Sequence, residues 1–211
     1  EVDGETRGLI TYMRTDSVRI ADDAIQQVRE EIGKLYGAEY VPDKPNAYKT
    51  KRGAQDAHEA IRPTDVSLHP NRIRELVDPD QAKLYELVWK RFVASQMKPQ
   101  VLDVISVDIE AAEYLLRATG SSVKFPGFAT LYTETRDESE EEEDTKSAVP
   151  ADISKDDALK LKDLDPEQHF TKPPARYSEA SLVKELEAKG IGRPSTYAQI
   201  ISTLQDREYV E

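Results

Sequence analysis

The chain contains no cysteine, and this absence excludes two kinds of site. Neither a disulfide framework nor a thiolate metal centre can form without cysteine side chains. Long hydrophobic runs are also missing, since none approaches the ~20 apolar residues that a membrane-spanning helix needs. The first residues, EVDGE, are acidic, whereas a secretory signal begins with a basic and then an apolar stretch. We expect a protein with no membrane segment that works in a reducing compartment, the cytoplasm.

Histidine is scarce, and positive side chains are outnumbered by negative ones. The three histidines, His58, His69 and His169, lie far apart and lack the spacing of a metal site, so no metal ligands are expected. Against 41 acidic side chains there are only 29 Lys and Arg, a formal net charge of −12. Because neutralising phosphates takes Lys and Arg, composition alone does not suggest nucleic acid. The excess of acidic side chains is concentrated in the run 134–144, which we expect to be a solvated loop. Residues 44–62, in contrast, are locally basic.

Hydrophobic spacing predicts a mainly helical first part. Apolar residues from Ala21 to Leu35 recur every three or four positions, the pattern of one helix face, and Gly37 ends this helix. A second helix is expected after Pro79, and it ends before Pro99. Its apolar face is predicted to contain Leu84, Val88 and Phe92. Three further elements are expected: a short strand over 9–13, a loop over 41–53 and a short helix over 54–61.

The period of the pattern changes from helix to strand after residue 99. Ile105, Val107 and Ile109 alternate with polar residues, which is typical of a half-buried strand. The predicted partner strands are 114–119 and 129–135, with turns at Gly120 and at Pro126-Gly127, and 158–163 is a further candidate strand.

Helical signals return in the last part of the chain. One helix is predicted from about Ser178 to Gly190, and Pro194 and Ser195 open a second, whose apolar face carries Ile200, Ile201 and Leu204. Two short helices around a glycine-containing turn resemble a helix-turn-helix element. An ordinary helical hairpin has the same pattern, and the residues alone favour it.

Tyr12 lies two residues before Arg14 and close to a helix-start signal at Asp16 and Ser17. A phenol, whose pKa is about 10, is a poor nucleophile at neutral pH. It becomes useful where a cation and oriented amide dipoles stabilise the phenolate and the group it attacks. Arg14 is a candidate for the cation, and the start of a helix capped by Asp16 or Ser17 is a natural phosphate site. The spacing alone is weak evidence, because a strand tyrosine is usually a packing residue.

Three long stretches of the chain stand out as motifs. They are GLITYMRTDS (8–17), AQDAHEAIRPT (54–64) and RYSEASLVKEL (176–186), the last running on to GIGRPSTYA (190–198). Together and in this order, they closely resemble the motifs of bacterial type IA DNA topoisomerases. The resemblance covers nearly the whole chain and is weakest over about 110–170.

The resemblance implies an α+β fold, mainly α, built from three parts. Residues 1–98 resemble the winged-helix-like helical domain that carries the nucleophilic tyrosine. Residues 99–172 resemble part of the β-rich gate domain, and residues 173–211 resemble a helical segment beside the DNA-binding groove. The family's N-terminal toprim domain has no counterpart here, so the chain is expected to be an internal fragment that is inactive by itself.

The resemblance also assigns roles to individual residues. The family enzymes cleave one DNA strand through a 5′-phosphotyrosyl intermediate, pass another strand and religate without ATP, which relaxes negative supercoils. Carried over to this sequence, the catalytic residues are Tyr12, Arg14 and His58. The residues expected to bind DNA are Arg14, Arg62, Arg193, Ser195, Thr196 and Tyr197. Tyr197 fits a core position equally well, being one turn from Ile200 and Ile201, and Glu59 is read as a helix-surface carboxylate.

Cofactor, partners and location follow from the same resemblance. Mg²⁺ is expected in the full-length enzyme, in an acidic cluster outside this chain, and no metal is expected within it. The expected substrate is single-stranded or negatively supercoiled DNA, and the full-length enzyme is expected to be a cytoplasmic, nucleoid-associated monomer. One alternative is a non-catalytic helix-turn-helix DNA-binding module, which the charge of −12 disfavours. Another is a protein-interaction domain that uses its acidic loop.

Overall fold

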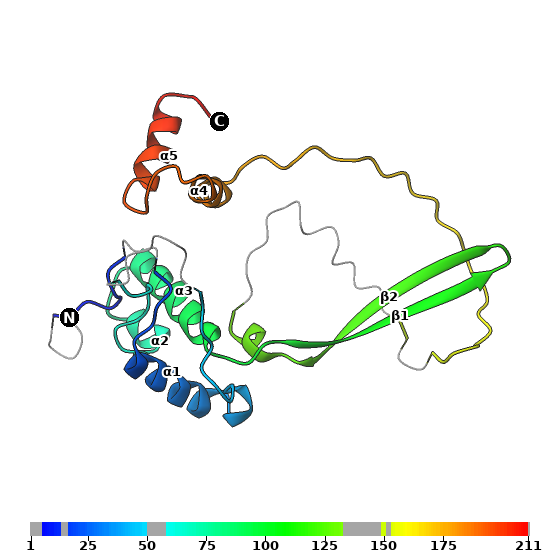
Figure 1. Ribbon diagram of the computed structural model, residues 1–211, viewed down its shortest axis with the longest axis horizontal. Helices are drawn as coiled ribbons and strands as arrows, with labels where there is room; N and C mark the ends of the chain where they lie inside the picture. The colour runs from blue at the N-terminus through cyan, green and yellow to red at the C-terminus, as the bar shows by residue number, and fades with distance from the viewer. Residues whose placement is uncertain (1–5, 14–16, 50–57, 133–148, 151–152, 211) are drawn as a thin grey trace. The chain divides into compact units, whose positions relative to one another are not determined.

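The computed structural model describes residues 6–13, 17–49, 58–132, 149–150 and 153–210 (Figure 1). It divides into two compact units. One unit draws on residues 1–100, 126–134 and 183–211, and the other on residues 101–125 and 135–182.

The first helix, α1 (Asp22–Leu35), confirms the predicted helix over 21–35. Its buried side chains are Ala24, Val28, Glu31 and Ile32, whereas Leu35 is exposed. The helix gives way to a short 3-10 turn, η1 (Ala38–Tyr40), at Gly37, whose φ of 106° is open to glycine but not to other residues at low cost. The loop predicted after it is confirmed over 41–49, and residues 50–53 lie outside the described ranges.

The helix predicted after Pro79 is α3 (Pro79–Ser95), which follows the short α2 (Pro70–Ile73). Asp78 caps α3, because its Oδ1 accepts hydrogen bonds from the Asp80 and Gln81 amides at 3.1 and 3.0 Å. The predicted apolar face is wrong in part: Phe92 is buried, but Leu84 is 54% exposed.

Two aromatic side chains determine which face of α3 is buried. Tyr85 and Trp89 point inward, and their polar atoms donate to the Leu68 and Val66 carbonyls at 2.7 and 2.9 Å. Large rings whose polar groups find buried acceptors bury more apolar area than a leucine does, so the helix turns its aromatic stripe inward. Apolar spacing alone does not tell whether the face with Leu84 or the face with Tyr85 and Trp89 is the buried one.

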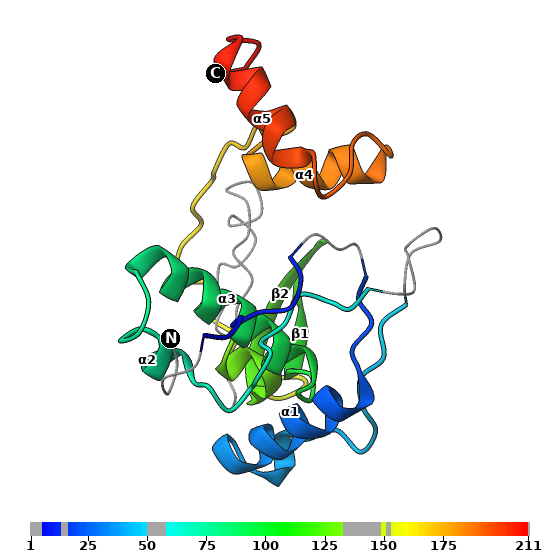
Figure 2. The same cartoon turned by 90° about the vertical axis from the view of Figure 1, so that its left-hand side faces the viewer.

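The core of the first unit lies between α1, α2 and α3 (Figure 2). Its centre consists of fully buried side chains: Val28, Ile32, Ile73, Val93 and Met97. The chain returns to this core at η2 (Gly127–Thr130), where Leu131 packs against it. Gly127 has a φ of 52°, and a Cβ there would collide with the Pro99 carbonyl, so this return needs glycine.

The second unit contains one antiparallel hairpin, formed by β1 (Val101–Ala111) and β2 (Tyr114–Phe125). It confirms the strands predicted over 105–109 and 114–119. The turn predicted at Gly120 is wrong, because Gly120 pairs with Ile105 inside β2, and the reversal occurs at Ala112, whose φ is 53°. The turn at Pro126-Gly127 is confirmed, since β2 ends at Phe125.

The other predicted strands are wrong in the part of the chain that is described. Residues 127–130 form η2 rather than a strand, and 133–135 lie outside the described ranges. Residues 158–163 are exposed and pair with no strand among the described residues. The expected half-buried pattern is confirmed in part: Val107 and Ile109 are half-buried next to exposed Asp108 and Glu110, whereas Ile105 is 40% exposed. The acidic run 134–144 also lies outside the described residues.

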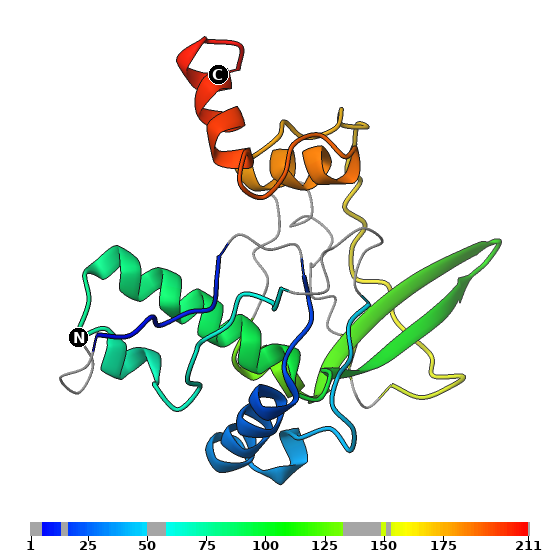
Figure 3. The same cartoon turned by 60° about the vertical axis from the view of Figure 1, so that its left-hand side comes forward.

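Two helices end the chain, α4 (Glu179–Ala188) and α5 (Tyr197–Asp206), and both confirm predicted elements. They run in different directions on either side of a turn (Figure 3). Gly190 and Gly192 shape this turn with φ values of 69° and 78°. The second helix begins at Tyr197, two residues after Ser195, because Arg193 to Thr196 form a hydrogen-bonded turn of their own.

Candidate active site and nucleic-acid interface

The segment that carries Tyr12 lies alongside the segment that follows His58. Ile10 and Pro63 form an antiparallel bridge, flanked by hydrogen bonds from Thr11 N to Arg62 O (2.9 Å) and from Thr64 N to Leu9 O (3.0 Å). The strand predicted over 9–13 is therefore reduced to a single bridge. Ile10 and Pro63 are a non-hydrogen-bonded pair, so the nitrogen of Pro63 points away from the partner segment and proline is tolerated there.

Thr11 fastens the two segments together through its side chain. Its Oγ1 donates to the Ala60 carbonyl at 2.8 Å and accepts from the Arg62 amide at 3.0 Å. Thr11 is the immediate neighbour of Tyr12, so these bonds fix the backbone from which the phenol projects. Sequence reasoning did not single out Thr11, because a threonine in a short strand carries no distinctive signal.

The pairing brings the rings of Tyr12 and His58 close together. Their centroids are 6.2 Å apart with the planes inclined at 57°. Tyr12 is 63% exposed, so its hydroxyl is accessible to a substrate, and His58 is half-buried. The helix predicted over 54–61 is wrong for 58–61, which is not helical, and 54–57 lie outside the described residues. The pairing of the two segments places the imidazole beside the phenol.

Glu59 joins three pieces of chain. One carboxylate oxygen accepts from the Ala21 amide at 2.8 Å, and the other pairs with Arg62 Nη2 at 2.9 Å. Next to it, the Ala60 amide donates to Arg19 O at 2.8 Å. The interpretation of Glu59 as a helix-surface carboxylate is therefore wrong. No sequence pattern announced this role, because it depends on contacts between residues 38 positions apart.

Arg62 is turned into the protein rather than toward solvent. Its side chain is 12% exposed, and besides the pair with Glu59 its Nη1 donates to the Pro63 carbonyl at 2.9 Å. Its direct contact with DNA stays a prediction.

The start of α1 is not capped as the sequence predicts. Arg14 and Asp16 lie outside the described residues. Ser17 is buried and accepts from the Arg19 amide at 3.2 Å, but the residue that precedes α1 is Ala21, which makes no side-chain cap. The prediction that Ser17 caps this helix is wrong. Glu59 supplies an acceptor at the helix start instead, from a distant part of the chain.

The second group of predicted site residues lies at the turn between α4 and α5. The Thr196 hydroxyl accepts from the Arg193 amide at 2.9 Å and donates to the Arg193 carbonyl at 3.1 Å. Arg193 and Ser195 are exposed, whereas Thr196 and Tyr197 are half-buried. Arg193 and Ser195 are therefore accessible to solvent, and Tyr197 is in part a packing residue.

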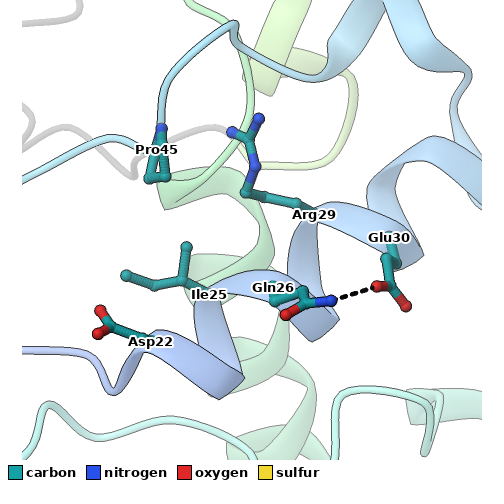
Figure 4. A pocket seen from close by; sticks show the side chains of 6 residues that line it. All are labelled: Asp22, Ile25, Gln26, Arg29, Glu30 and Pro45. Carbon is teal, nitrogen blue, oxygen red and sulfur yellow. Dashed lines mark hydrogen bonds between the residues drawn. The ribbon is translucent and has the colours of Figure 1, made fainter.

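A hollow lies elsewhere on the described surface. It has a volume of about 530 Å³ and lies over the first half of α1 (Figure 4). Its lining residues are Asp22, Ile25, Gln26, Arg29, Glu30 and Pro45. Gln26 donates to Glu30 at 3.1 Å, and Arg29 donates to the Pro42 carbonyl at 2.7 Å. None of the motif side chains lines it, so the hollow is separate from the tyrosine site.

The other two histidines each lie next to a carboxylate. His69 Nε2 lies 2.9 Å from the buried Glu31 carboxylate, and His169 lies 3.1 Å from Glu167. Among the described residues, no three His, Cys, Asp or Glu side chains gather as a metal site would require. Nor is any helix in these ranges both long and apolar enough to cross a bilayer.

Comparisons with known proteins give a consistent result. The chain matches the DNA topoisomerase family over residues 5–211. It is 51% identical over 213 residues to DNA topoisomerase 1 of Rickettsia bellii, a match that covers all of this chain and 26% of that protein. With DNA topoisomerase 1 of Salmonella typhimurium it shares 50% identity over 203 residues, covering 96% of this chain and 23% of that protein.

A solved structure agrees with these matches. Full-length topoisomerase I from Thermotoga maritima superposes with a TM-score of 0.75 at 36% identity, covering all of this chain and 32% of that one. The helix-dominated fold with its small antiparallel sheet, together with three motifs that follow one another in the family's order, is that of a topoisomerase. The chain belongs to the bacterial DNA topoisomerase family of type IA. It spans about a quarter of the length of the curated relatives it matches.

Proposed function

We propose that this chain supplies the nucleophile and part of the DNA path of a type IA DNA topoisomerase. The observation that carries the proposal is the exposed phenol of Tyr12 beside the His58 imidazole, on a segment fastened through Thr11. An accessible hydroxyl next to a proton-carrying ring is what nucleophilic attack on a phosphate requires.

The proposed reaction exchanges one phosphoester for another. The Tyr12 oxygen attacks a backbone phosphorus of single-stranded DNA, the bond to the 3′ oxygen breaks, and a 5′-phosphotyrosyl link forms. The phenol proton leaves as the bond forms, and the departing 3′ oxygen takes up a proton. Because the covalent link conserves the energy of the phosphodiester, the 3′ hydroxyl can later reverse the step without ATP. Passage of another strand before religation relaxes negative supercoils.

Charge develops on the phosphate oxygens during attack, and two side chains are proposed to stabilise it. Arg14 offers a guanidinium that contacts two phosphate oxygens at once. His58 offers an imidazole N–H next to Tyr12. Arg193, Ser195, Thr196 and Tyr197 are proposed to hold the DNA backbone, since an exposed guanidinium and hydroxyls at a helix start suit phosphate.

The remaining assignments rest on the family resemblance. Residues 1–98 are proposed to act as the winged-helix-like tyrosine domain, 99–172 as part of the gate, and 173–211 as part of the DNA groove. Mg²⁺, with its site outside this chain, and a monomeric, cytoplasmic full-length enzyme stay predictions of the same kind.

Replacing Tyr12 tests the proposal directly, in a full-length protein that carries this chain. Tyr12→Phe keeps the ring and removes the attacking oxygen, so denaturant-trapped covalent DNA should disappear while DNA affinity stays within about twofold. Tyr114→Phe is a matched control, because Tyr114 is 67% exposed and lies on the hairpin. Covalent DNA that survives Tyr12→Phe would refute the nucleophile. A wild-type protein that binds DNA but never traps it would favour the non-catalytic binding module.

A further inference from the structure

We propose that Glu59 and Arg62 are positioning residues for the nucleophile, an inference that rests on the proposed role of Tyr12. Glu59 links Arg62 to the start of α1, and this link holds the segment 58–62 against the segment of Tyr12. In this proposal neither side chain contacts DNA, which for Arg62 departs from the contact that the family resemblance implies. Their effect on the reaction is exerted through His58 and Tyr12.

The Glu59 carboxylate connects two separate pieces of chain. Its two oxygens are used by two different partners, the Ala21 amide at 2.8 Å and the Arg62 guanidinium at 2.9 Å. The Glu59 and Arg62 side chains are 23% and 12% exposed, so this pair is more shielded from water than a surface ion pair. Charge-assisted hydrogen bonds in such a setting are stronger and more directional than those between exposed chains.

A series of contacts leads from the Glu59–Arg62 pair to the phenol of Tyr12. The Arg62 backbone bonds Thr11 in both directions, through N–H to Oγ1 at 3.0 Å and through C=O to the Thr11 amide at 2.9 Å. Thr11 is the residue before Tyr12, and Glu59 is the residue after His58. A shift of the Glu59–Arg62 pair therefore changes the distance between phenol and imidazole.

The pairing of Arg62 with Glu59 also bears on whether Arg62 binds a phosphate. The Arg62 side chain holds Glu59 and the Pro63 carbonyl, is only 12% exposed and has a buried Nε, so it presents little surface to a phosphate. A phosphate contact and a positioning role lead to different expected results when Arg62 is replaced. Losing it would weaken DNA binding and lower the salt dependence of binding by about one phosphate, whereas losing a positioning contact slows the chemical step.

The test uses Glu59→Gln and Arg62→Lys in a full-length protein that carries this chain. Single-turnover formation of covalent DNA gives the rate, and DNA affinity at two salt concentrations gives the binding terms. We expect the rate to fall about 10–100-fold, since a misplacement of about 1 Å can cost 10²-fold, while affinity and its salt dependence stay unchanged. Glu86→Gln is the matched control, because Glu86 pairs with Arg74 at 2.8 Å and is similarly exposed at 27%.

A third variant keeps both charges and removes only the anchor at α1. Ala21→Pro deletes the amide that donates to Glu59, and the φ of −67° at this position is one that proline adopts. It should slow cleavage as Glu59→Gln does, and it answers the question even if Glu59→Gln unfolds.

Two outcomes would overturn the inference. One is a loss of affinity with a smaller salt dependence in Arg62→Lys, which would make Arg62 a DNA contact. The other is an unchanged cleavage rate in the folded variants. Either leaves the proposed function standing, as long as Tyr12→Phe abolishes the covalent complex.

Discussion

Replacing Thr11 by valine should measure how firmly the tyrosine segment is fastened. Valine has the shape of threonine and the same β-branch, so the packing and extended backbone preference are kept. The substitution removes the hydroxyl that donates to the Ala60 carbonyl and accepts from the Arg62 amide. Both partners are left without this hydrogen bond in a partly buried place.

The magnitude follows from the number of bonds lost. A net contribution of about 0.5–1.5 kcal/mol per hydrogen bond gives about 1–3 kcal/mol for two. Water can reach part of this site, so we expect the lower half of that range, about 1–2 kcal/mol. Urea unfolding of the chain, followed by the fluorescence of Trp89 in the helical core, measures this change at an unchanged m-value.

Thr11→Ser is the control, because serine keeps the hydroxyl and loses only the methyl group. It should lie closer to the wild type than valine does. If Thr11→Val unfolds at the wild-type urea concentration, the two hydrogen bonds contribute nothing to stability. If Thr11→Ser is as unstable as Thr11→Val, the methyl group rather than the hydroxyl is what matters.

Three further predictions concern catalysis and pH. Arg14→Ala and His58→Ala in the full-length protein should each slow cleavage by about 10²–10³ with smaller effects on affinity, and Arg14→Lys should retain part of the rate; equal losses of rate and affinity would contradict this. The chain alone should leave supercoiled plasmid unrelaxed in a gel assay, whereas relaxation by a contaminant-free preparation would contradict the proposed dependence on the rest of the enzyme. Hydrogen bonds from Lys90 and Arg74 lower the pKa of Glu86 below its ordinary value of 4.5. The stabilisation is therefore present above that value and lost as pH falls through the lowered pKa, and Glu86→Gln should flatten this part of an acid unfolding curve.

Local patterns predicted those parts of the fold that depend on neighbours in sequence. The helices α1, α3, α4 and α5 and the pairing of β1 with β2 follow from apolar period, caps and glycines. The errors occur where distant residues decide. Gly120 reads as a turn until its pairing with Ile105 is known, and Leu84 reads as core until Tyr85 and Trp89 are seen to find buried acceptors.

The residues of the candidate site fall into the same two groups, those that sequence motifs indicate and those that depend on distant contacts. The motif resemblance identified Tyr12 and His58, and the structure brings these two rings together. It did not identify Thr11 or Glu59, whose roles arise only when residues 38 to 51 positions apart meet. An arginine in a family motif also reads as a phosphate ligand from sequence, although the side chain of Arg62 lies against Glu59.

The exposed hairpin has a consequence for how the chain unfolds. A two-stranded ribbon in water is marginally stable at best, and β1 and β2 leave apolar side chains such as Val104 and Leu115 uncovered. The core between α1 and α3 has no such weakness. Amide protons of the hairpin should therefore exchange with solvent long before those of α1 and α3, and a protease should cut the ribbon first. A melting temperature read from helix signals then describes the helical unit and not the ribbon.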